Sequence, residues 1–573
     1  MSSKDRDHDD TRGTSAAKGA AGSQAPAETG EDGDGPAPQR ASTAPQSRKG
    51  VFTRFLDFVE WLGNLLPHPV TLFALICVAV LLVSGLAGLL GWQVQDPRPP
   101  GAAGRSADGV IRAVSLLNAE GFRRIAMGVV TNFTGFAPLG TVLVAMLGVG
   151  VAERSGLLGA AVRAMVLGAP RNLLTMVVVF AAVVSNTASE MGYVVLIPLA
   201  AVVFHSVGRH PLAGLAAAFA GVSGGYSANL LIGTVDPLLS GITTEAAAII
   251  DPAYAVGGAR EVLPTANWFF MMISTVMITI VGTLVTTKIV EPKLGTYDPG
   301  NAEEGIEEST RGMGEMSALE RKGLLWAGIT VLALVAGLIF TAMPGGWFRD
   351  PEVDGALLQE IRPLLRSVVS LIFVFFVVPG VVYGRITRSI RSDRDVIDGM
   401  AKSMSTLGLY MVLVFFAAQF VAFFRWTNLG TILAVTGADL LRDWNLTGPL
   451  VFIPFILMCC FVNLMLGSAS AQWAVTAPIF VPMLMTIGYS PQVIQAAYRI
   501  GDSTTNIITP MMSYFGLILA FAIRYDKKLG IGTLIATMIP YSICYLAGWV
   551  VLFYGWVFVL DLPVGPGTPT FYP

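Results

Sequence analysis

The stretch 448–515 constrains the fold more than any other part of the chain. An apolar run stops at the polar segment 463–470, and a second run returns through Trp473 to Pro482. Each apolar arm is only about 15 residues long, whereas a helix needs about 20 residues to cross a bilayer. The pattern therefore predicts a re-entrant hairpin with a polar tip at membrane depth. Such a tip is tolerated only where protein or a water-filled cavity surrounds it.

The composition predicts a polytopic membrane protein. Hydrophobic residues make up 53% of the chain and charged residues 13%, against about 25% charged residues in a soluble domain. A net charge of −2 leaves no basic face for nucleic acid. Residues 1–50 contain no Leu, Ile, Val or aromatic residue, so we expect a disordered cytoplasmic tail that lacks the apolar core of a signal peptide. Residues 51–66 are amphipathic and are expected to lie at the membrane interface.

Hydropathy and charge predict the topology of a transporter domain at 51–560, followed by a C-terminal tail at 561–573. The long apolar spans are expected at 69–91, 125–152, 266–289, 322–343, 364–384, 404–424 and 530–560. Loop 385–402 is the densest basic loop and should be cytoplasmic. Threading the chain from this loop puts the N-terminus inside and the C-terminus outside. The spans 69–91, 125–152, 322–343 and 364–384 lack buried charge and are expected to form a dimer scaffold.

The segment 172–237 repeats the organisation of 448–515. Both contain a hairpin, a Gly-Xaa-Xaa-Pro sequence, a helix and a break in that helix. A shift of 280 residues pairs Pro211 with Pro491 and Gly221 with Gly501, and the hairpin tips match at a shift of 281. The expected fold is all-α, with about nine transmembrane helices and two oppositely oriented re-entrant hairpins. Inverted repeats with broken helices are typical of secondary transporters.

The two tips carry the groups that a coupling ion needs. Ser185, Asn186 and Thr187 stand at the first tip, and Ser468 and Ser470 at the second. Hydroxyl, amide and backbone oxygens suit a hard cation such as Na⁺, with Asn186 and Thr187 as the candidate metal ligands. The return helices begin at the tips, so their positive ends can meet a substrate carboxylate. The alternative is that these side chains only cap the turns.

Ionisable groups inside apolar sequence mark a functional site, because leaving them in hydrocarbon costs at least ~2.5 kcal/mol each. Arg499 and Asp502 lie three residues apart on one helical face and can pair with each other as a structural lock. In the functional alternative, Arg499 binds a carboxylate and Asp502 is a cation ligand or proton carrier. Asp236 is a second carboxylate candidate or a helix cap, and Glu190 a proton site or a solvated turn residue. The ion-coupling candidates are Ser185, Asn186, Thr187, Ser468, Thr505, Asn506, Asp236 and Asp502.

Four stretches give the chain a recognisable resemblance, namely 221–231, 234–237, 467–473 and 498–506. Over roughly 51–560 the chain resembles the p-aminobenzoyl-glutamate transporter family (AbgT). The resemblance implies a homodimer of nine-span protomers in the ion-transporter superfamily, each protomer with its own path. It is also similar to divalent-anion/sodium symporters, whose Ser-Asn-Thr tips bind Na⁺ and carboxylate. The second tip departs from that motif at 467–469, which weakens the case for two equivalent sodium sites.

The resemblance also implies a substrate path and a substrate. The path would be lined by Asp236, Ser470, Trp473, Pro491, Arg499, Asp502 and Pro510, to which we add Asn229. p-Aminobenzoyl-glutamate offers an aromatic ring for Trp473 and carboxylates for Arg499, although a tryptophan at this depth can equally be a packing residue. Members of the family are regarded as importers of this compound or as exporters of sulfonamides. We expect no cofactor, with Na⁺ or H⁺ as the coupling ion.

Two rival functions start from the same residues. Asp236 and Asp502 occupy matching repeat positions, as the aspartates of an intramembrane protease would. The Gly-Xaa-Gly-Asp signature of those enzymes is incomplete, because Arg499 stands where its first glycine belongs. A passive anion channel would conduct regardless of an imposed ion gradient, and a Na⁺/dicarboxylate symporter would carry another substrate. We therefore expect no enzyme but an ion-coupled carrier of small anionic compounds in the bacterial plasma membrane.

Overall fold

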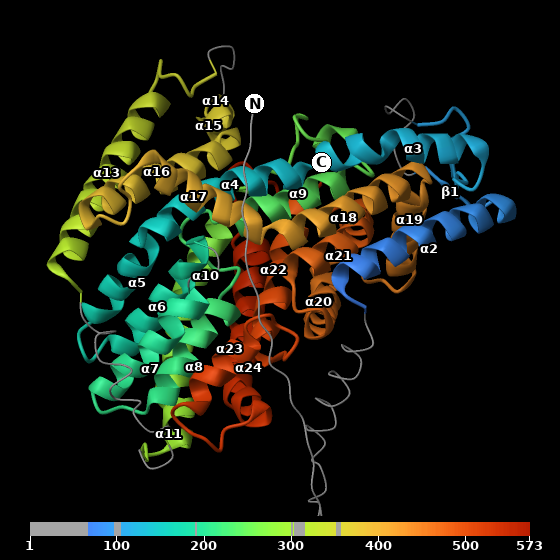
Figure 1. Ribbon diagram of the computed structural model, residues 1–573. Helices are drawn as coiled ribbons and strands as arrows, with labels where there is room; N and C mark the ends of the chain where they lie inside the picture. Colours follow the sequence, from blue (N-terminus) through green and yellow to red (C-terminus); the bar gives the residue numbers. More distant parts are fainter. Residues whose placement is uncertain are drawn as a thin grey trace, which may run out of the picture. The chain divides into compact units, whose positions relative to one another are not determined.

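The computed structural model describes residues 67–96, 105–188, 192–298, 302, 316–350 and 357–572. The predicted tail 1–50, the amphipathic segment 51–66 and Glu190 lie outside these ranges. Within them the chain is helical (Figure 1), and its two strands, β1 (Gln93–Gln95) and β2 (Val110–Arg112), pair antiparallel with Gln93 opposite Arg112.

Within the described residues, eight helical segments are long and apolar enough to cross a membrane. They are Pro69–Leu90, Ala119–Ser155, Trp268–Leu294, Ala318–Ala342, Val368–Thr387, Gly408–Trp426, Pro449–Leu466 and Ile531–Val559. Seven of them overlap the long spans predicted from sequence, and the eighth, Pro449–Leu466, is the first arm of the predicted second hairpin. The prediction of an all-α, multi-span membrane protein is confirmed.

The predicted span 125–152 is interrupted rather than continuous. It comprises α3 (Ala119–Thr134) and α4 (Ala137–Ser155), which are separated at Gly135 and Phe136. Pro138 stands in the first turn of α4, where its missing N–H leaves no intrahelical bond unmade. Hydropathy alone did not reveal this break, because both halves are apolar.

Three of the predicted scaffold segments pack together. Helix α4 lies against α16 (Val368–Thr387), and α16 lies against α13 (Ala318–Ala342). The approach is close, since a Cβ on Gly148 would lie 2.8 Å from the Phe373 carbonyl oxygen. Helix α2 (Pro69–Leu90) instead packs on α18 (Gly408–Trp426). The apolar side chains of α13 are mostly exposed, which suits contact with lipid or with a second copy.

The remaining helices include those that form the two repeated segments. Before the first long loop come α5 (Leu157–Leu167), α6 (Leu174–Ser185), η1 (Asn186–Ala188), η2 (Gly192–Leu196), α7 (Ile197–Ser206), α8 (Pro211–Phe219), η3 (Ala220–Gly224), α9 (Val235–Ala247), η4 (Pro252–Tyr254), α10 (Trp268–Val285), η5 (Thr286–Val290) and α11 (Glu291–Leu294). After it come α14 (Leu357–Glu360), α15 (Arg362–Arg366), α17 (Asp393–Thr406), α19 (Leu429–Asp443), η7 (Pro449–Val451), α20 (Phe452–Leu466), α21 (Ala469–Thr486), α22 (Pro491–Thr505), η8 (Asn506–Ile508), α23 (Phe515–Ile523), α24 (Ile531–Phe553) and η9 (Tyr554–Val559).

The second hairpin turns where its polar tip predicts. Helix α20 has 15 residues and ends at Gly467, whose φ of +55° suits glycine. Helix α21 begins two residues later and has 18 residues, so the returning arm is longer than the sequence suggested. The first tip is the 3₁₀ turn η1 after α6, and the predicted helix break at 221–225 falls in the π-helical turn η3.

The first unit (172–237) and the second unit (448–515) pack their broken helices in the same way. A Cβ on Gly221 would lie 2.8 Å from the Val179 carbonyl oxygen and 2.5 Å from the Ala182 Cβ. A Cβ on Gly501 would meet the Ile456 carbonyl oxygen and the Cys459 Cβ at the same two distances. In both units a glycine thus allows the broken helix to touch the first arm of its hairpin.

Candidate functional site

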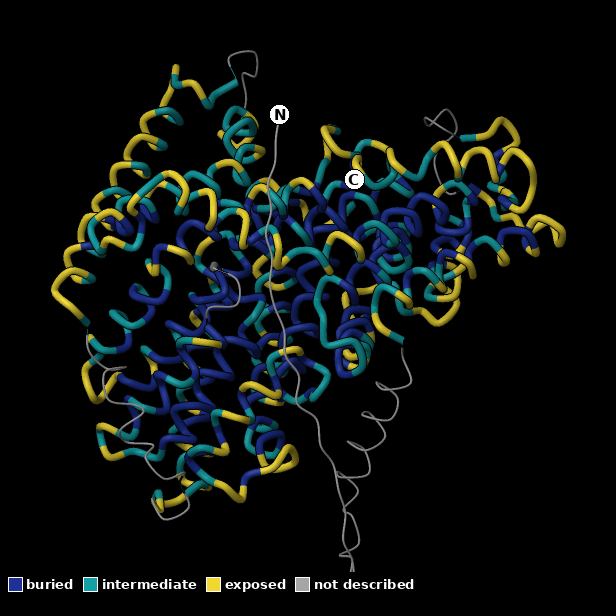
Figure 2. The backbone as a smooth tube through the Cα atoms, viewed as in Figure 1, coloured by how far each residue is buried: buried dark blue, intermediate teal, exposed yellow. Residues whose placement is uncertain are grey.

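A buried ion pair joins the two units. Every residue of α22 is buried, and Figure 2 shows mostly buried backbone in the region where Figure 1 labels this helix. The Arg499 Nη2 donates to Asp236 Oδ1 at 2.6 Å, and each side chain is 4% exposed. The second Asp236 oxygen accepts from the Gly233 backbone amide at 2.7 Å. The alternative in which Arg499 pairs with Asp502 is not realised: Asp236 is the partner of Arg499, because α9 brings its first turn to the middle of α22.

Asp502 lies three residues further along α22 without any such partner. Its exposed fraction is 0%, and neither carboxylate oxygen has a hydrogen-bond partner among the described residues. An isolated carboxylate is very costly to bury as an anion. The group therefore calls for a proton or a cation, which is the property that an ion-coupling residue needs.

Asn463, at the end of α20, holds the break in α22 in place. Its Nδ2 lies 2.6 Å from the Asp502 backbone oxygen, 2.9 Å from Thr505 Oγ1 and 2.8 Å from Asn506 Oδ1. The amide oxygen of Asn463 has no hydrogen-bond partner among the described residues, and the same is true of the Gln472 amide oxygen. Oxygen acceptors without donors are typical of a place that receives a cation or a protonated group.

The two tips line one cavity of about 220 Å³. From the first tip comes Asn186, and from the second come Ser468 and Ser470, whose hydroxyl oxygens lie 3.4 Å apart. Asn506, Tyr226, Ser513 and a stacked pair, Tyr193 and Tyr514 (centroids 4.6 Å apart), also belong to the polar part of the wall. The structure therefore brings together tips that are about 280 residues apart in sequence.

The three residues of the first tip differ in their contacts. The Asn186 Nδ2 donates to the Gly225 carbonyl at 3.3 Å, and its Oδ1 has no hydrogen-bond partner among the described residues. The hydroxyl of Ser185 donates to the Ala182 carbonyl, and the hydroxyl of Thr187 donates to Asn229 Oδ1 at 2.8 Å. Of the two predicted Na⁺ ligands, Asn186 lines the tip cavity, whereas Thr187 is engaged with Asn229 outside its lining. Among the described residues no group of three His, Cys, Asp or Glu side chains forms a metal site.

Trp473 is packed inside the protein. Its ring is fully buried and stacks on Tyr498 with the centroids 4.2 Å apart, and its Nε1 donates to Thr243 Oγ1 at 2.9 Å. This contact set is the one that the packing interpretation predicts, and a substrate would have to displace Tyr498 to stack on that face of the ring. Pro491 begins α22 and Pro510 follows η8, so both flank the helix outside the tip cavity.

The sequence interpretation missed the polar side chains that hold Arg499. Asn267 Oδ1 accepts from Arg499 Nε at 3.1 Å and from Gln495 Nε2 at 2.7 Å. Thr243 Oγ1 donates to Gln495 Oε1 at 2.5 Å. An available signal was that each of these residues is a buried polar group beside or within an apolar stretch, which normally has a partner.

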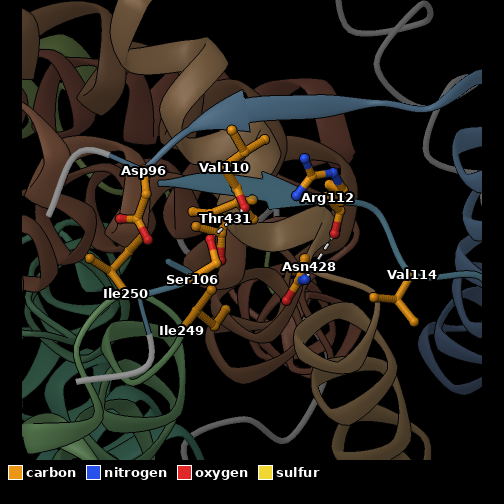
Figure 3. A pocket seen from close by; sticks show the side chains of 10 residues that line it. Asp96, Ser106, Val110, Arg112, Val114, Ile249, Ile250, Asn428 and Thr431 are labelled. Carbon is orange, nitrogen blue, oxygen red and sulfur yellow. Dashed lines mark hydrogen bonds between the residues drawn. The ribbon is translucent and has the colours of Figure 1, made fainter. Parts of the chain in front are cut away.

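A separate cavity of about 350 Å³ lies between the β1–β2 ribbon, the end of α9 and the start of α19 (Figure 3). The Asn428 amide donates to the Arg112 carbonyl at 2.9 Å, and the Ser106 hydroxyl donates to the Val110 carbonyl at 2.8 Å. The Arg112 guanidinium, together with Ser106 and the Val110 amide, lowers the pKa of Asp108 to about 2. None of the predicted site residues lines this cavity.

Comparisons with known proteins identify the family of the chain. A family described as the "AbgT putative transporter family" matches residues 54–572. The p-aminobenzoyl-glutamate transport protein of Escherichia coli (strain K12) is 37% identical over 516 residues, which are 90% of this chain and 96% of that protein.

Two solved structures resemble the chain over most of its length. MtrF of Neisseria gonorrhoeae, described as illuminating a class of antimetabolite efflux pumps, is 60% identical with a TM-score of 0.83, covering 90% of this chain and all of the MtrF chain. The YdaH transporter of Alcanivorax borkumensis is 43% identical with a TM-score of 0.79, covering 87% of this chain and all of the YdaH chain. The chain is thus no enzyme but a multi-pass membrane transporter, and it belongs to the AbgT family.

Proposed function

We propose that this protein is an ion-coupled secondary transporter of p-aminobenzoyl-glutamate or related folate-pathway compounds that combine an aromatic ring with carboxylates. One observation carries the proposal: α22 holds a buried arginine paired to a carboxylate from the other unit, beside a second carboxylate without a hydrogen-bond partner. The names of the Escherichia coli and Neisseria gonorrhoeae relatives support the substrate class.

The ion pair suits competition with an anionic substrate. A carboxylate of the substrate is a chemical equivalent of Asp236 and binds the planar guanidinium of Arg499 in the same geometry. When the substrate takes this place, Asp236 is released from Arg499 and must be neutralised. Binding of an anion is thereby linked to uptake of a proton or a cation by the same pair of units.

Asp502 and the tip oxygens are the proposed coupling groups. A proton on Asp502 removes the cost of burying its charge. A sodium ion would instead use oxygens that lack donors, among them those of Asn186 and Asn463. Both alternatives predict that the coupling ion binds within the two units and not on the surrounding helices.

The proposed architecture has nine spans and two hairpins of opposite orientation, in a homodimer of the bacterial plasma membrane with the N-terminus inside and the C-terminus outside. The matching glycine contacts of the two units and their shared tip cavity support the inverted repeat. The exposed apolar face of α13 supports a scaffold that contacts lipid or a partner. Transport then requires the hairpin-bearing core to move against this scaffold.

The test follows labelled p-aminobenzoyl-glutamate in liposomes that contain the purified protein, with a Na⁺ gradient or a pH gradient imposed separately. Accumulation driven by inward Na⁺ would support import and coupling at the tips. Movement of p-aminobenzoyl-glutamate driven only by protons that flow in the opposite direction would support export, with Asp236 or Asp502 as the proton carrier. Flux that ignores both gradients would identify a channel, and absence of flux under either gradient would refute the substrate.

A further inference from the structure

A further cavity of about 410 Å³ opens on the side of the protein where the C-terminal segment docks. The segment 566–569 forms one wall, and the tail is held by Ser490, whose backbone amide donates to the Thr570 carbonyl at 3.2 Å. Apolar walls come from Tyr254, Leu263 and Leu358. The volume is within the range of small-molecule sites, roughly 300–1,000 Å³.

Arg362 is the charged group of this cavity that forms no direct ion pair among the described residues, and the nearest balancing charge is the more distant Glu261 carboxylate, which pairs with Arg366. The neighbouring Arg260 pairs with Asp251 at 3.1 Å, and Arg366 pairs with Glu261 at 3.6 Å. Among the described residues no carboxylate lies within ion-pair distance of Arg362, whose Nη2 donates to the carbonyls of Gly258 and Ala259. Burial and the nearby Arg366 guanidinium lower the pKa of Arg362. A planar cation with most of its donors unused is suited to a carboxylate.

Gln492 supplies the second recognition group. It lines the cavity from the first turn of α22 and is 7% exposed, yet its side-chain oxygen has no hydrogen-bond partner among the described residues. A buried acceptor without a donor costs stability, so a ligand that offers an N–H group gains by filling it.

The cavity is also connected to the central ion pair. The backbone carbonyl of Gln492 accepts from Asn267 Nδ2 at 2.8 Å, and Asn267 Oδ1 accepts from Arg499 Nε at 3.1 Å. A continuous chain of hydrogen bonds therefore runs from Gln492 to Arg499 and Asp236. A ligand bound at Gln492 touches the same helix that carries the proposed transport site.

We propose that this cavity is a vestibule subsite for carboxylates that carry a nearby N–H donor, recognised by Arg362 and Gln492 before or after passage through the central site. The inference rests on the proposed function, because it assumes that the same class of substrate binds in this cavity as well as at the central site. Arg362 binds the carboxylate, Gln492 Oε1 accepts the N–H, and the apolar walls hold an aromatic or aliphatic body. N-acylated acidic amino acids have this combination of groups.

The test measures equilibrium binding of N-benzoyl-glutamate to the purified full chain in an Arg499→Ala background, where the central site is disabled. We expect binding to persist there and to weaken about 10- to 100-fold when Arg362→Gln is added, the range for losing a charged hydrogen bond. Arg366→Gln is the matched control, since Arg366 also donates to the loop carbonyls of Gly257 and Gly258 but does not line the cavity. Equal weakening by both variants, or none by Arg362→Gln, would overturn the proposal.

A second measurement avoids the Arg499→Ala variant in case it does not fold. In the otherwise native protein, the N-methylated amide of N-benzoyl-glutamate should bind about 10-fold more weakly than the N–H compound, and Gln492→Leu should abolish that preference. An unchanged preference in Gln492→Leu would contradict the assignment of Gln492. Arg362-dependent binding without any flux of p-aminobenzoyl-glutamate would refute the proposed function alone, whereas normal coupled flux with Arg362-independent binding would refute the vestibule alone.

Discussion

The first and second units share their packing but differ in their charges. In each unit a glycine brings the broken helix against the first hairpin arm, and an asparagine at the end of that arm donates to the broken helix. The second unit also carries Arg499 and Asp502 inside α22, whereas the first unit contributes Asp236 from the helix after its break. The repeat thus supplies a common frame, and the charged residues of the proposed transport site are what distinguishes its two copies.

Disruption of the ion pair between the two units should have the largest effect on stability and flux. Arg499→Ala leaves Asp236 buried without its partner, so the free energy of unfolding should fall by about 3–5 kcal/mol and flux should be lost. The double variant Arg499→Gln with Asp236→Asn should recover much of the stability but no flux. Thermal unfolding in detergent and liposome flux measure the two effects. Recovered flux in the double variant would mean that the pair is only a structural lock.

Alanine at the two matched glycines tests whether the frame is shared. Gly221→Ala and Gly501→Ala each place a Cβ 2.8 Å from a backbone carbonyl oxygen. Each should lower the free energy of unfolding by about 1–3 kcal/mol, because backbone must shift to make room. Gly516→Ala is the control, since an added Cβ there meets nothing within 4 Å. If only one of the two variants lowered the free energy of unfolding, the two units would not be packed in the same way.

The asparagines at the hairpin tips should differ in how much they contribute to the free energy of unfolding. Asn463 lies within hydrogen-bond distance of three acceptors at 2.6–2.9 Å, whereas Asn186 makes one bond at 3.3 Å. Asn463→Ala should cost about 1–3 kcal/mol, and Asn186→Ala about 0.5–1.5 kcal/mol. Flux measured against the Na⁺ gradient adds a second readout. A loss of sodium dependence in Asn463→Ala but not in Asn186→Ala would remove Asn186 from the proposed sodium site.

The smallest effects are expected at the stacked aromatic residues. Trp473→Phe keeps a ring on Tyr498 but loses the bond to Thr243, and Tyr193→Phe keeps the stack on Tyr514 but loses the bond to Ser223. Tyr193→Phe should cost about 0.5–1.5 kcal/mol, the value of a single hydrogen bond. Trp473→Phe should cost somewhat more, because the smaller ring also leaves a cavity in a fully buried place. The half-saturating substrate concentration should change little in either variant. If the half-saturating substrate concentration rose strongly in Trp473→Phe alone, at unchanged thermal stability, the tryptophan would be a substrate contact.

Hydropathy sufficed for the spans because a bilayer requires about 20 apolar residues per helix whatever the neighbours are. The same argument located both tips, since polar residues that interrupt apolar runs are unambiguous in sequence. It did not reveal the break between α3 and α4, where apolar residues continue across Gly135 and Phe136. The length of α21 was underestimated for a related reason, because Pro478 and Pro482 lie inside this helix without ending it.

Hydropathy and polar interruptions were enough to predict the membrane class, the long spans, the two polar tips and the presence of charge in α22. Which groups meet depends on how the helices pack. Helical spacing allowed a pair between Arg499 and Asp502, but the arginine reaches Asp236, 263 positions away, and is held by Asn267, the residue that precedes α10. The physical reason is that spacing along a helix reports only local neighbours. A buried charge is satisfied by whichever group the packed helices bring within about 3 Å.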